Sequence, residues 1–133
     1  MSNMNAPAVS RRKEAYPWAL QFWATAHVEP GRLVQILTGA ILGCGGWVLS
    51  RGASDNGAVH MVFEFERENC EDIYSVLVSS GLNLSHIGHF RLTELCQCTR
   101  RSATDCGGDI VSIDLDIETF PAEPQVFGMP SGL

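Results

Sequence analysis

The sequence has 133 residues, of which 45% are hydrophobic and 18% are charged, as is usual for one globular domain. Its net charge of −6 argues against nucleic acid and against an anionic membrane surface as partners. No apolar run approaches the ~20 residues of a membrane span, and no secretory signal pattern opens the chain, so we expect a cytoplasmic protein. The 5 cysteines are odd in number, and we expect reduced thiols rather than a disulfide scaffold.

We expect one folded domain over residues 15–120, between a flexible leader at 1–14 and a C-terminal tail at 121–133. The first element of the domain is a strand over residues 18–28, because every second residue there is apolar. Trp23 falls on the opposite face of this strand. A large aromatic side chain at that position indicates that the second face of the sheet is also covered, for instance by another subunit.

A helix is predicted directly after the Pro30-Gly31 dipeptide. Apolar residues recur there with the spacing of one buried helical stripe: Leu33, Ile36, Leu37, Ala40 and Ile41. Pro30 suits the first turn, where its missing N–H needs no partner, and the glycines of residues 43–46 end the helix.

A hairpin and a second helix come next. Residues 47–51 form a short strand, Asn56-Gly57 is a strong turn signal, and residues 59–66 alternate as the returning strand. A second amphipathic helix is predicted from Asn69, a candidate N-cap, to Gly81.

The last part of the domain is less regular. Residues 90–98 fit either a strand or a helix, and the pattern leaves both open. Residues 113–118 alternate apolar with mostly acidic side chains, which predicts a strand at a sheet edge, where charges discourage pairing with another chain. The fold class predicted is α+β: a ferredoxin-like βαββαβ sandwich whose antiparallel sheet carries two helices on one face, with an extra C-terminal edge strand.

The first strand–helix junction resembles the opening half of ACT domains. The resemblance rests on a run through the turn and on apolar or small residues after it: Val28, Glu29, Pro30, Gly31, Arg32, Leu33, Ile36, Ala40, Gly45, Val48 and Ser50. It covers about half of the chain, and the Pro-Gly-x-Leu element is its most specific part. ACT domains commonly bind amino acids or other small metabolites at dimer interfaces and regulate attached catalytic domains.

This resemblance implies a ligand site at the turn. The residues that it assigns to ligand binding are Glu29, Gly31, Arg32, Leu33 and, at the second strand, Trp47. Glycine lets a ligand approach the backbone, and the unpaired N–H groups of a helix N-terminus attract a carboxylate. We therefore expect a standalone ACT-like regulatory or binding module that forms a homodimer and binds a small metabolite, such as an amino acid, or a partner protein.

A second group of residues defines an alternative pocket or an interface. Trp23, His27, His60 and Val62 all fall on the face opposite the apolar side of their strands. If the first and third strands are neighbours, the two histidines approach each other across the sheet. Two alternatives follow: a small dimeric α+β-barrel enzyme that uses the His27/His60 face, and a purely structural interaction subunit.

The cysteines suggest a weaker site. Cys96, Cys98 and Cys106, with His86 and His89 nearby in the sequence, offer soft ligands, but C-x-C is tighter than the usual zinc knuckle, and buried thiols are the preferred interpretation. The sequence has no P-loop, no G-x-G-x-x-G, no G-x-S-x-G and no H-E-x-x-H. We therefore predict no metal and no cofactor, and a binding role rather than an enzymatic one.

Overall fold

The computed structural model describes residues 18–101 and 110–120 of the chain. The predicted leader at 1–14, the tail at 121–133 and Cys106 lie outside these residues. In chain order the elements are β1 (Ala19–Ala26), α2 (Pro30–Gly43), β2 (Trp47–Ala53), β3 (Ala58–Glu66), the 3₁₀ turn η2 (Arg67–Asn69), α3 (Cys70–Ser79), β4 (Asn83–Leu84), α4 (His86–Arg101) and β5 (Ile110–Thr119).

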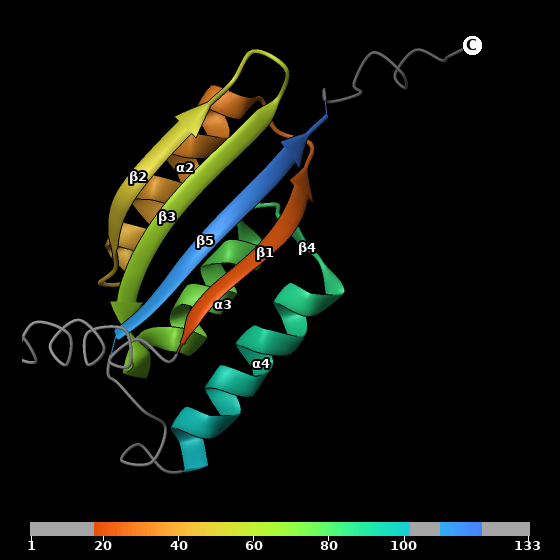
Figure 1. Cartoon of the computed structure of the whole chain (residues 1–133). Coiled ribbons are helices and arrows are strands. Elements are labelled where there is room, and N and C mark those ends of the chain that lie inside the picture. Colours follow the sequence, from red (N-terminus) through yellow and green to blue (C-terminus); the bar gives the residue numbers. More distant parts are fainter. Residues whose placement is uncertain (1–17, 102–109, 121–133) are drawn as a thin grey trace, which may run out of the picture.

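The strands form one mixed sheet in the order β2-β3-β5-β1-β4. β5 runs parallel to β1 and antiparallel to β3, and the two outer pairs are antiparallel. The helices α2, α3 and α4 lie behind one face of this sheet, and no described helix covers the other face (Figure 1). The α+β class is confirmed, with three helices on one face where the sequence predicted two.

The order of the strands differs from the ferredoxin-like prediction. That prediction makes the first and third strands neighbours, whereas β5 pairs with both of them and separates them. It also places residues 113–118 at a sheet edge, and this is wrong, because β5 is the central strand. Alternation of apolar and acidic residues is the pattern of any strand with one wet face, so it does not distinguish the centre of such a sheet from its edge.

Residues 90–98 belong to α4, so the helical alternative is correct. The buried residues of this helix include Leu92, Leu95 and Cys96, whose spacing places them on one stripe. A strand would have turned alternate residues toward the core instead. No described helix is long and apolar enough to cross a membrane.

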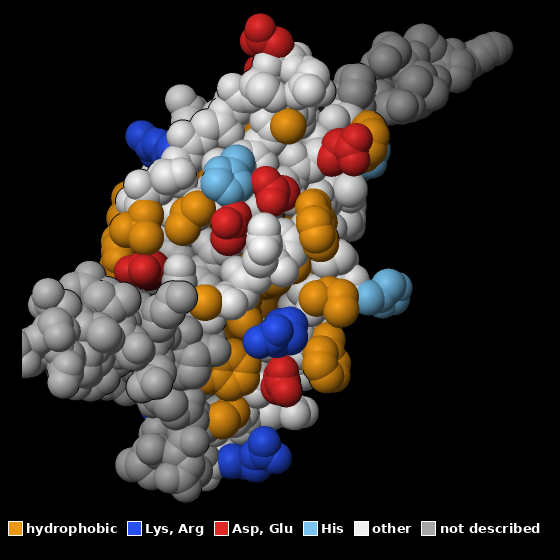
Figure 2. All heavy atoms as spheres, in the orientation of Figure 1, with side chains coloured by type: hydrophobic (Ala, Val, Ile, Leu, Met, Phe, Trp, Pro, Cys, Tyr) orange, Lys and Arg blue, Asp and Glu red, His pale blue; other side chains and the backbone are white. Residues whose placement is uncertain are grey.

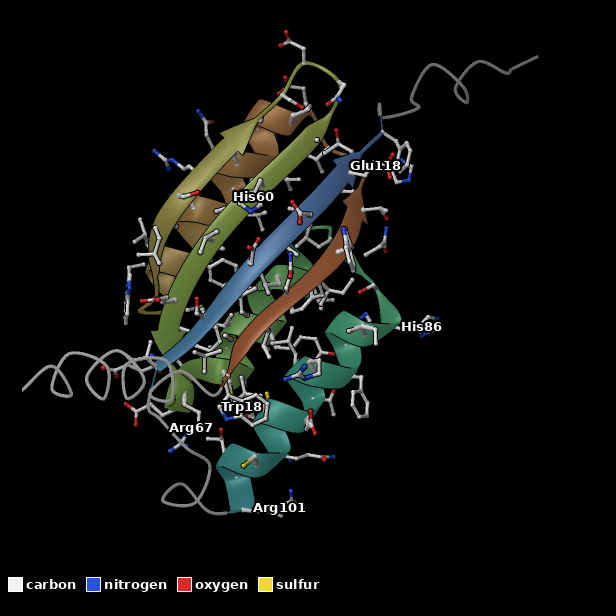
Figure 3. The ribbon with its side chains drawn as sticks, in the orientation of Figure 1. Trp18, His60, Arg67, His86, Arg101 and Glu118 are labelled. Atoms are coloured by element: carbon white, nitrogen blue, oxygen red, sulfur yellow. The ribbon has the colours of Figure 1, made fainter. Side chains whose placement is uncertain are left out.

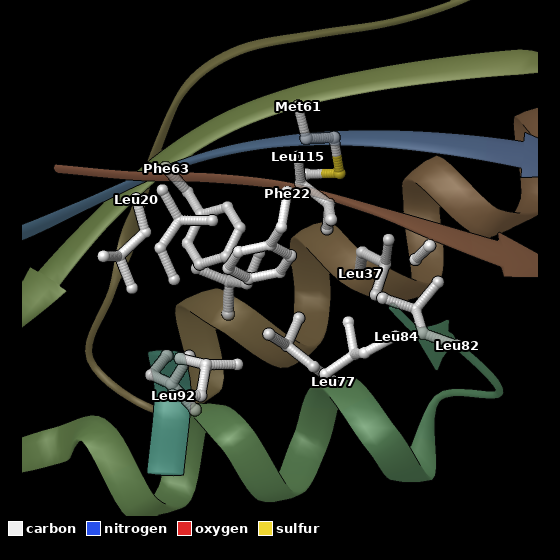
Figure 4. Close-up of a cluster of buried hydrophobic side chains, with 14 of the residues drawn as sticks. Leu20, Phe22, Leu37, Met61, Phe63, Leu77, Leu82, Leu84, Leu92 and Leu115 are labelled. Atoms are coloured by element: carbon white, nitrogen blue, oxygen red, sulfur yellow. The ribbon is translucent and has the colours of Figure 1, made fainter. Parts of the chain in front are cut away.

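The core fills the space between the sheet and the helices (Figure 4). Every second residue of β1, β3 and β5 faces it, and α2 contributes Leu33, Leu37 and Ile41, as its predicted stripe requires. The largest fully buried side chains are Phe22, Phe63 and Phe65. The hairpin turn predicted at Asn56-Gly57 is also present: Gly57 has a φ of 94°, and Asn56 Oδ1 accepts a hydrogen bond from the Ala58 N–H.

Two glycines in helices test this packing. A Cβ at Gly88 of α4 would come within 2.8 Å of Phe22 Cδ1, and Phe22 is fully buried. We therefore expect Gly88→Ala to lower the free energy of unfolding by about 1–3 kcal/mol. A Cβ at Gly39 of α2 meets nothing within 4 Å, so Gly39→Ala should raise that free energy by about 0.5–1 kcal/mol. Urea unfolding followed by circular dichroism measures both, and changes of the same sign would contradict the packing described.

Candidate functional site

The uncovered face of the sheet carries most of the polar side chains that could act together. Because side chains alternate along a strand, the residues between the core positions of β1, β3 and β5 all point to this face. A histidine and acidic side chains gather over the middle of the sheet in Figure 2, and Figure 3 labels His60 there and Glu118 near the end of β5.

Strand register brings four of these residues into one row. Gly52 pairs with His60, His60 pairs with Asp116, and Asp116 pairs with Trp23. Directly opposed residues of antiparallel strands, such as His60 and Asp116, have Cβ atoms only about 4.5–5.5 Å apart. The central strand therefore supplies a carboxylate that lies between an imidazole on one side and an indole on the other.

His60 is held by the acidic residues of β5. Its Nε2 lies 2.7 Å from Asp114 Oδ1 and 4.0 Å from Asp116 Oδ1. The side chains remain about half exposed, at 48% for His60 and 41% for each aspartate. The group is thus ordered by its own contacts and still accessible to a ligand from solvent.

A hollow of about 800 Å³ lies over the end of this face that is next to the turn between β2 and β3. Its lining comes from all five strands of the sheet and includes Trp23, Ser50, Gly52, His60, Asp116 and Glu118. Gly52 leaves open space, since a Cβ there would meet nothing within 4 Å. Ligand pockets commonly measure about 300–1,000 Å³, so the hollow is large enough for a small metabolite.

The turn residues that the sequence assigned to ligand binding make contacts within the chain itself. Glu29 is the N-cap of α2, and its Oε1 accepts a hydrogen bond of 3.1 Å from the Arg32 N–H. The chain's own carboxylate therefore occupies the position where a ligand carboxylate was expected. Leu33 is fully buried in the core, so its side chain is not available to a ligand, while Gly31 and Arg32 are exposed.

Trp47 lies far from that turn. It begins β2, beyond the C-terminal end of α2, whose 14 residues span about 21 Å at 1.5 Å per residue. Its Nε1 donates a hydrogen bond of 3.0 Å to Glu64 Oε1. The structure therefore does not bring Trp47 together with Glu29 and Gly31, and their role in ligand binding stays a prediction.

The second group of predicted residues is split. Trp23 and His60 line the hollow, and Val62 lies half-buried on the same face. His27 follows the end of β1 and its ring lies 5.6 Å from that of Phe120, outside the lining of the hollow. The expected approach of His27 and His60 is wrong, because β5 separates their strands.

The cysteines and histidines near α4 do not form one cluster. Cys70 and Cys96 are buried free thiols, whereas Cys98 is disulfide-bonded, so the expectation of reduced thiols is wrong at Cys98. His89 Nδ1 lies 2.7 Å from the hydroxyl of Tyr74. His86 is exposed at the start of α4 and points away from the domain (Figure 3).

A different set of residues has the chemistry to hold a metal ion. His60, Asp114 and Asp116 each offer one ligand atom, and these atoms all lie within 4.8 Å of one another. Imidazole and carboxylate are ordinary ligands of zinc and related divalent metals. The sequence did not reveal this set, because its members come from two strands whose pairing only the fold shows.

Comparison with protein-family models, with curated proteins and with solved structures finds no match to this chain.

The cap at Glu29 can be tested by substitution. We expect Glu29→Ala to lower the free energy of unfolding by about 0.5–1 kcal/mol, because a first-turn N–H loses its side-chain partner. Glu29→Asp keeps a carboxylate at the N-cap and should retain most of the stability. Urea unfolding of the three proteins measures this. Equal stability of Glu29→Ala and the parent would mean that the carboxylate is free to serve a ligand instead.

Proposed function

We propose that this chain is a small-molecule binding module whose site is the hollow on the open face of the sheet. Its ligand is a metabolite that bears an ammonium or guanidinium group, such as a basic amino acid. The observation that carries this proposal is the placement of Trp23 of β1 beside Asp116 of β5 at the wall of the hollow. Glu118 lies on β5 as well.

The lining suits a cation in two ways. Trp23 is 60% exposed, so a face of its indole is available for a cation–π contact, which is worth about 0.5–2 kcal/mol. Asp116 and Glu118 supply carboxylates, which form the stronger, charge-assisted hydrogen bonds with ammonium and guanidinium groups. An indole and carboxylates that face one space select for a positively charged ligand.

The one arginine among the described lining residues does not cancel this charge. Arg51 belongs to β2, where it pairs with Met61, a residue of the core side. Its Nη1 donates a hydrogen bond of 3.1 Å to Thr38 Oγ1 of α2. The guanidinium is thereby held toward the helix layer, and the acidic groups dominate the hollow.

The same charges favour a ligand over a second copy of the chain on this face. Two copies stacked through their open faces would bring Asp114, Asp116 and Glu118 of each copy near the same residues of the other. Like charges in a desolvated interface cost several kcal/mol. A homodimer and a regulatory role remain proposals from the ACT-like resemblance, and a dimer would need another surface than this one.

Binding of a cationic ligand predicts a thermal shift. A ligand at ten times its Kd adds about 1.4 kcal/mol to the stability, which raises the Tm of a domain of this size by roughly 6–11 °C. We expect lysine, arginine or putrescine to raise the Tm, and glutamate to leave it unchanged. Trp23→Ala and Glu118→Gln should each weaken binding about tenfold, as is expected when a contact worth about 1.4 kcal/mol is lost.

Two matched variants control for stability and net charge. Phe90→Ala removes an exposed aromatic ring of α4, and Glu68→Gln removes an exposed carboxylate outside the hollow. Both should bind the ligand as the parent does. The proposal is wrong if no cationic compound shifts the Tm, or if the control variants weaken binding as much as those in the hollow.

A divalent metal ion is the second candidate ligand, and the set of His60, Asp114 and Asp116 favours it. The hydrogen bond from His60 to Asp114 would be replaced by two metal–ligand bonds of about 2.0–2.2 Å. The hollow beside His60 leaves room for further ligands from water or from a bound metabolite.

Zinc titration separates the two candidates. We expect Zn²⁺ to bind the parent in isothermal titration calorimetry and His60→Ala to weaken this binding by more than about tenfold, because the imidazole is the best zinc ligand of the set. Trp23→Ala should leave Zn²⁺ binding unchanged while it weakens the organic cation. His86→Ala, which removes an exposed histidine at the start of α4, is the matched control. Equal losses in His60→Ala and His86→Ala would contradict a metal site in the hollow.

A further inference from the structure

A pair of cysteines lies in the helix layer, apart from the hollow on the open face. Cys70 is the first residue of α3, and Cys96 lies in the middle of α4. Their exposed fractions are only 1% and 4%, and both are free thiols. Two cysteines from different helices thus lie buried together between α3 and α4.

The two sulfurs are in direct contact. The Cys96 thiol hydrogen-bonds to the sulfur of Cys70, and this contact lowers the pKa of Cys70 to about 7. The same contact, together with burial, raises the pKa of Cys96. Cys70 also begins a helix of 10 residues, and a helix N-terminus favours a thiolate. The pair therefore loses its first thiol proton at a lower pH than an ordinary cysteine does, and its second at a higher pH.

A small hollow gives access to this pair. It measures about 270 Å³, and its lining includes Cys96, Tyr74, Glu71 and Arg100. Glu71 and Arg100 form an ion pair of 2.6 Å beside it, between exposed side chains of α3 and α4. The space is large enough for hydrogen peroxide, and its lining includes Cys96, whose sulfur contacts that of Cys70.

We propose that Cys70 and Cys96 form a redox-active dithiol that a hydroperoxide converts into a disulfide between α3 and α4. The site is independent of the ligand site on the open face. The disulfide would add a covalent link between two helices whose contacts in the reduced protein, packing, the Tyr74–His89 hydrogen bond and the Glu71–Arg100 ion pair, are all non-covalent.

The chemistry balances in two steps. The Cys70 thiolate attacks one oxygen of the peroxide, the O–O bond breaks, and the leaving hydroxide takes a proton to become water, which gives a sulfenic acid on Cys70. The Cys96 sulfur then attacks the Cys70 sulfur, the S–O bond breaks, and the thiol proton leaves with the hydroxide as a second water. The two sulfurs are oxidised by two electrons in total, and the peroxide is reduced to two molecules of water.

Cys44 serves as the internal control. It is less buried than the pair, but burial and the carboxylate of Asp72 raise the pKa of its thiol. Within residues 18–101 and 110–120 no cysteine lies beside it, and its Sγ donates a hydrogen bond to the Asp72 carbonyl oxygen at 3.7 Å. If access alone decided reactivity, Cys44 would be oxidised first, whereas the dithiol predicts the opposite order.

The test treats the whole protein with a limiting amount of hydrogen peroxide, alkylates the remaining thiols and digests the product with trypsin. We expect mass spectrometry to find peptide 68–91, which contains Cys70, linked to peptide 92–100, which contains Cys96 and also Cys98 with its existing disulfide. Cys44 should be recovered alkylated in peptide 33–51. The initial rate should rise roughly tenfold from pH 6 to pH 8, because the thiolate fraction of Cys70 rises over that range.

Variants assign the link to these two sulfurs. Cys96→Ala should abolish the link and leave Cys70 at the sulfenic or sulfinic stage, whereas Cys98→Ser should retain it. If a variant does not fold, fragmentation of the linked peptides from the parent assigns the link to Cys96 or to Cys98, and a link through Cys98 alone contradicts the proposal. Oxidation of Cys44 before Cys70, or oxidation of Cys70 to sulfinic acid in the parent without any link to Cys96, would overturn the proposal.

Discussion

The two-sided pairing of β5 is the constraint on which the rest of the structure depends. β5 hydrogen-bonds to β1 on one side and to β3 on the other, and without it the sheet would separate into two small antiparallel pairs. Isolated strand pairs are at best marginally stable in water. One face of β5 supplies Val111, Ile113, Leu115 and Ile117 to the core, while the other sets an acidic row along the middle of the open face. Folding and the candidate site therefore rest on the same strand.

The sheet has few other places where a partner could add. Its outer strand β2 has a register shift between Val48 and Ser50, and β4 at the opposite edge has only two residues. Bulges and very short strands are features that discourage pairing with a further chain. With both edges interrupted in this way and one face covered by helices, the open face is the part of the sheet that remains for recognition.

Local signals in the sequence predicted the local elements. The stripe of Leu33, Leu37 and Ile41 and the Asn56-Gly57 turn each depend on residues close together in the chain, and the structure has the elements that they predict. The position of β5 could not be obtained in this way, because pairing between residues such as Trp23 and Asp116 is set by the packing of the whole sheet. The same limit explains the site. The sequence pattern placed Trp23 and His60 opposite the core face of their strands and made them candidates for a site. It led Asp114 and Asp116 to be interpreted as charges on an edge strand.

The turn at Glu29 shows how a similar sequence can serve a different purpose. A glycine beside a helix N-terminus is a suitable anion site in principle, because the first N–H groups lack partners. Here Glu29 lies one residue before the helix and satisfies one of these groups itself, at 3.1 Å from the Arg32 nitrogen. A ligand carboxylate would have to displace this side chain and would meet its negative charge.

An ammonium group on the open face meets the reverse situation, since Asp116 and Glu118 project from the central strand with an exposed indole beside them. The electrostatics of the chain thus place a cation at the sheet more readily than an anion at the turn.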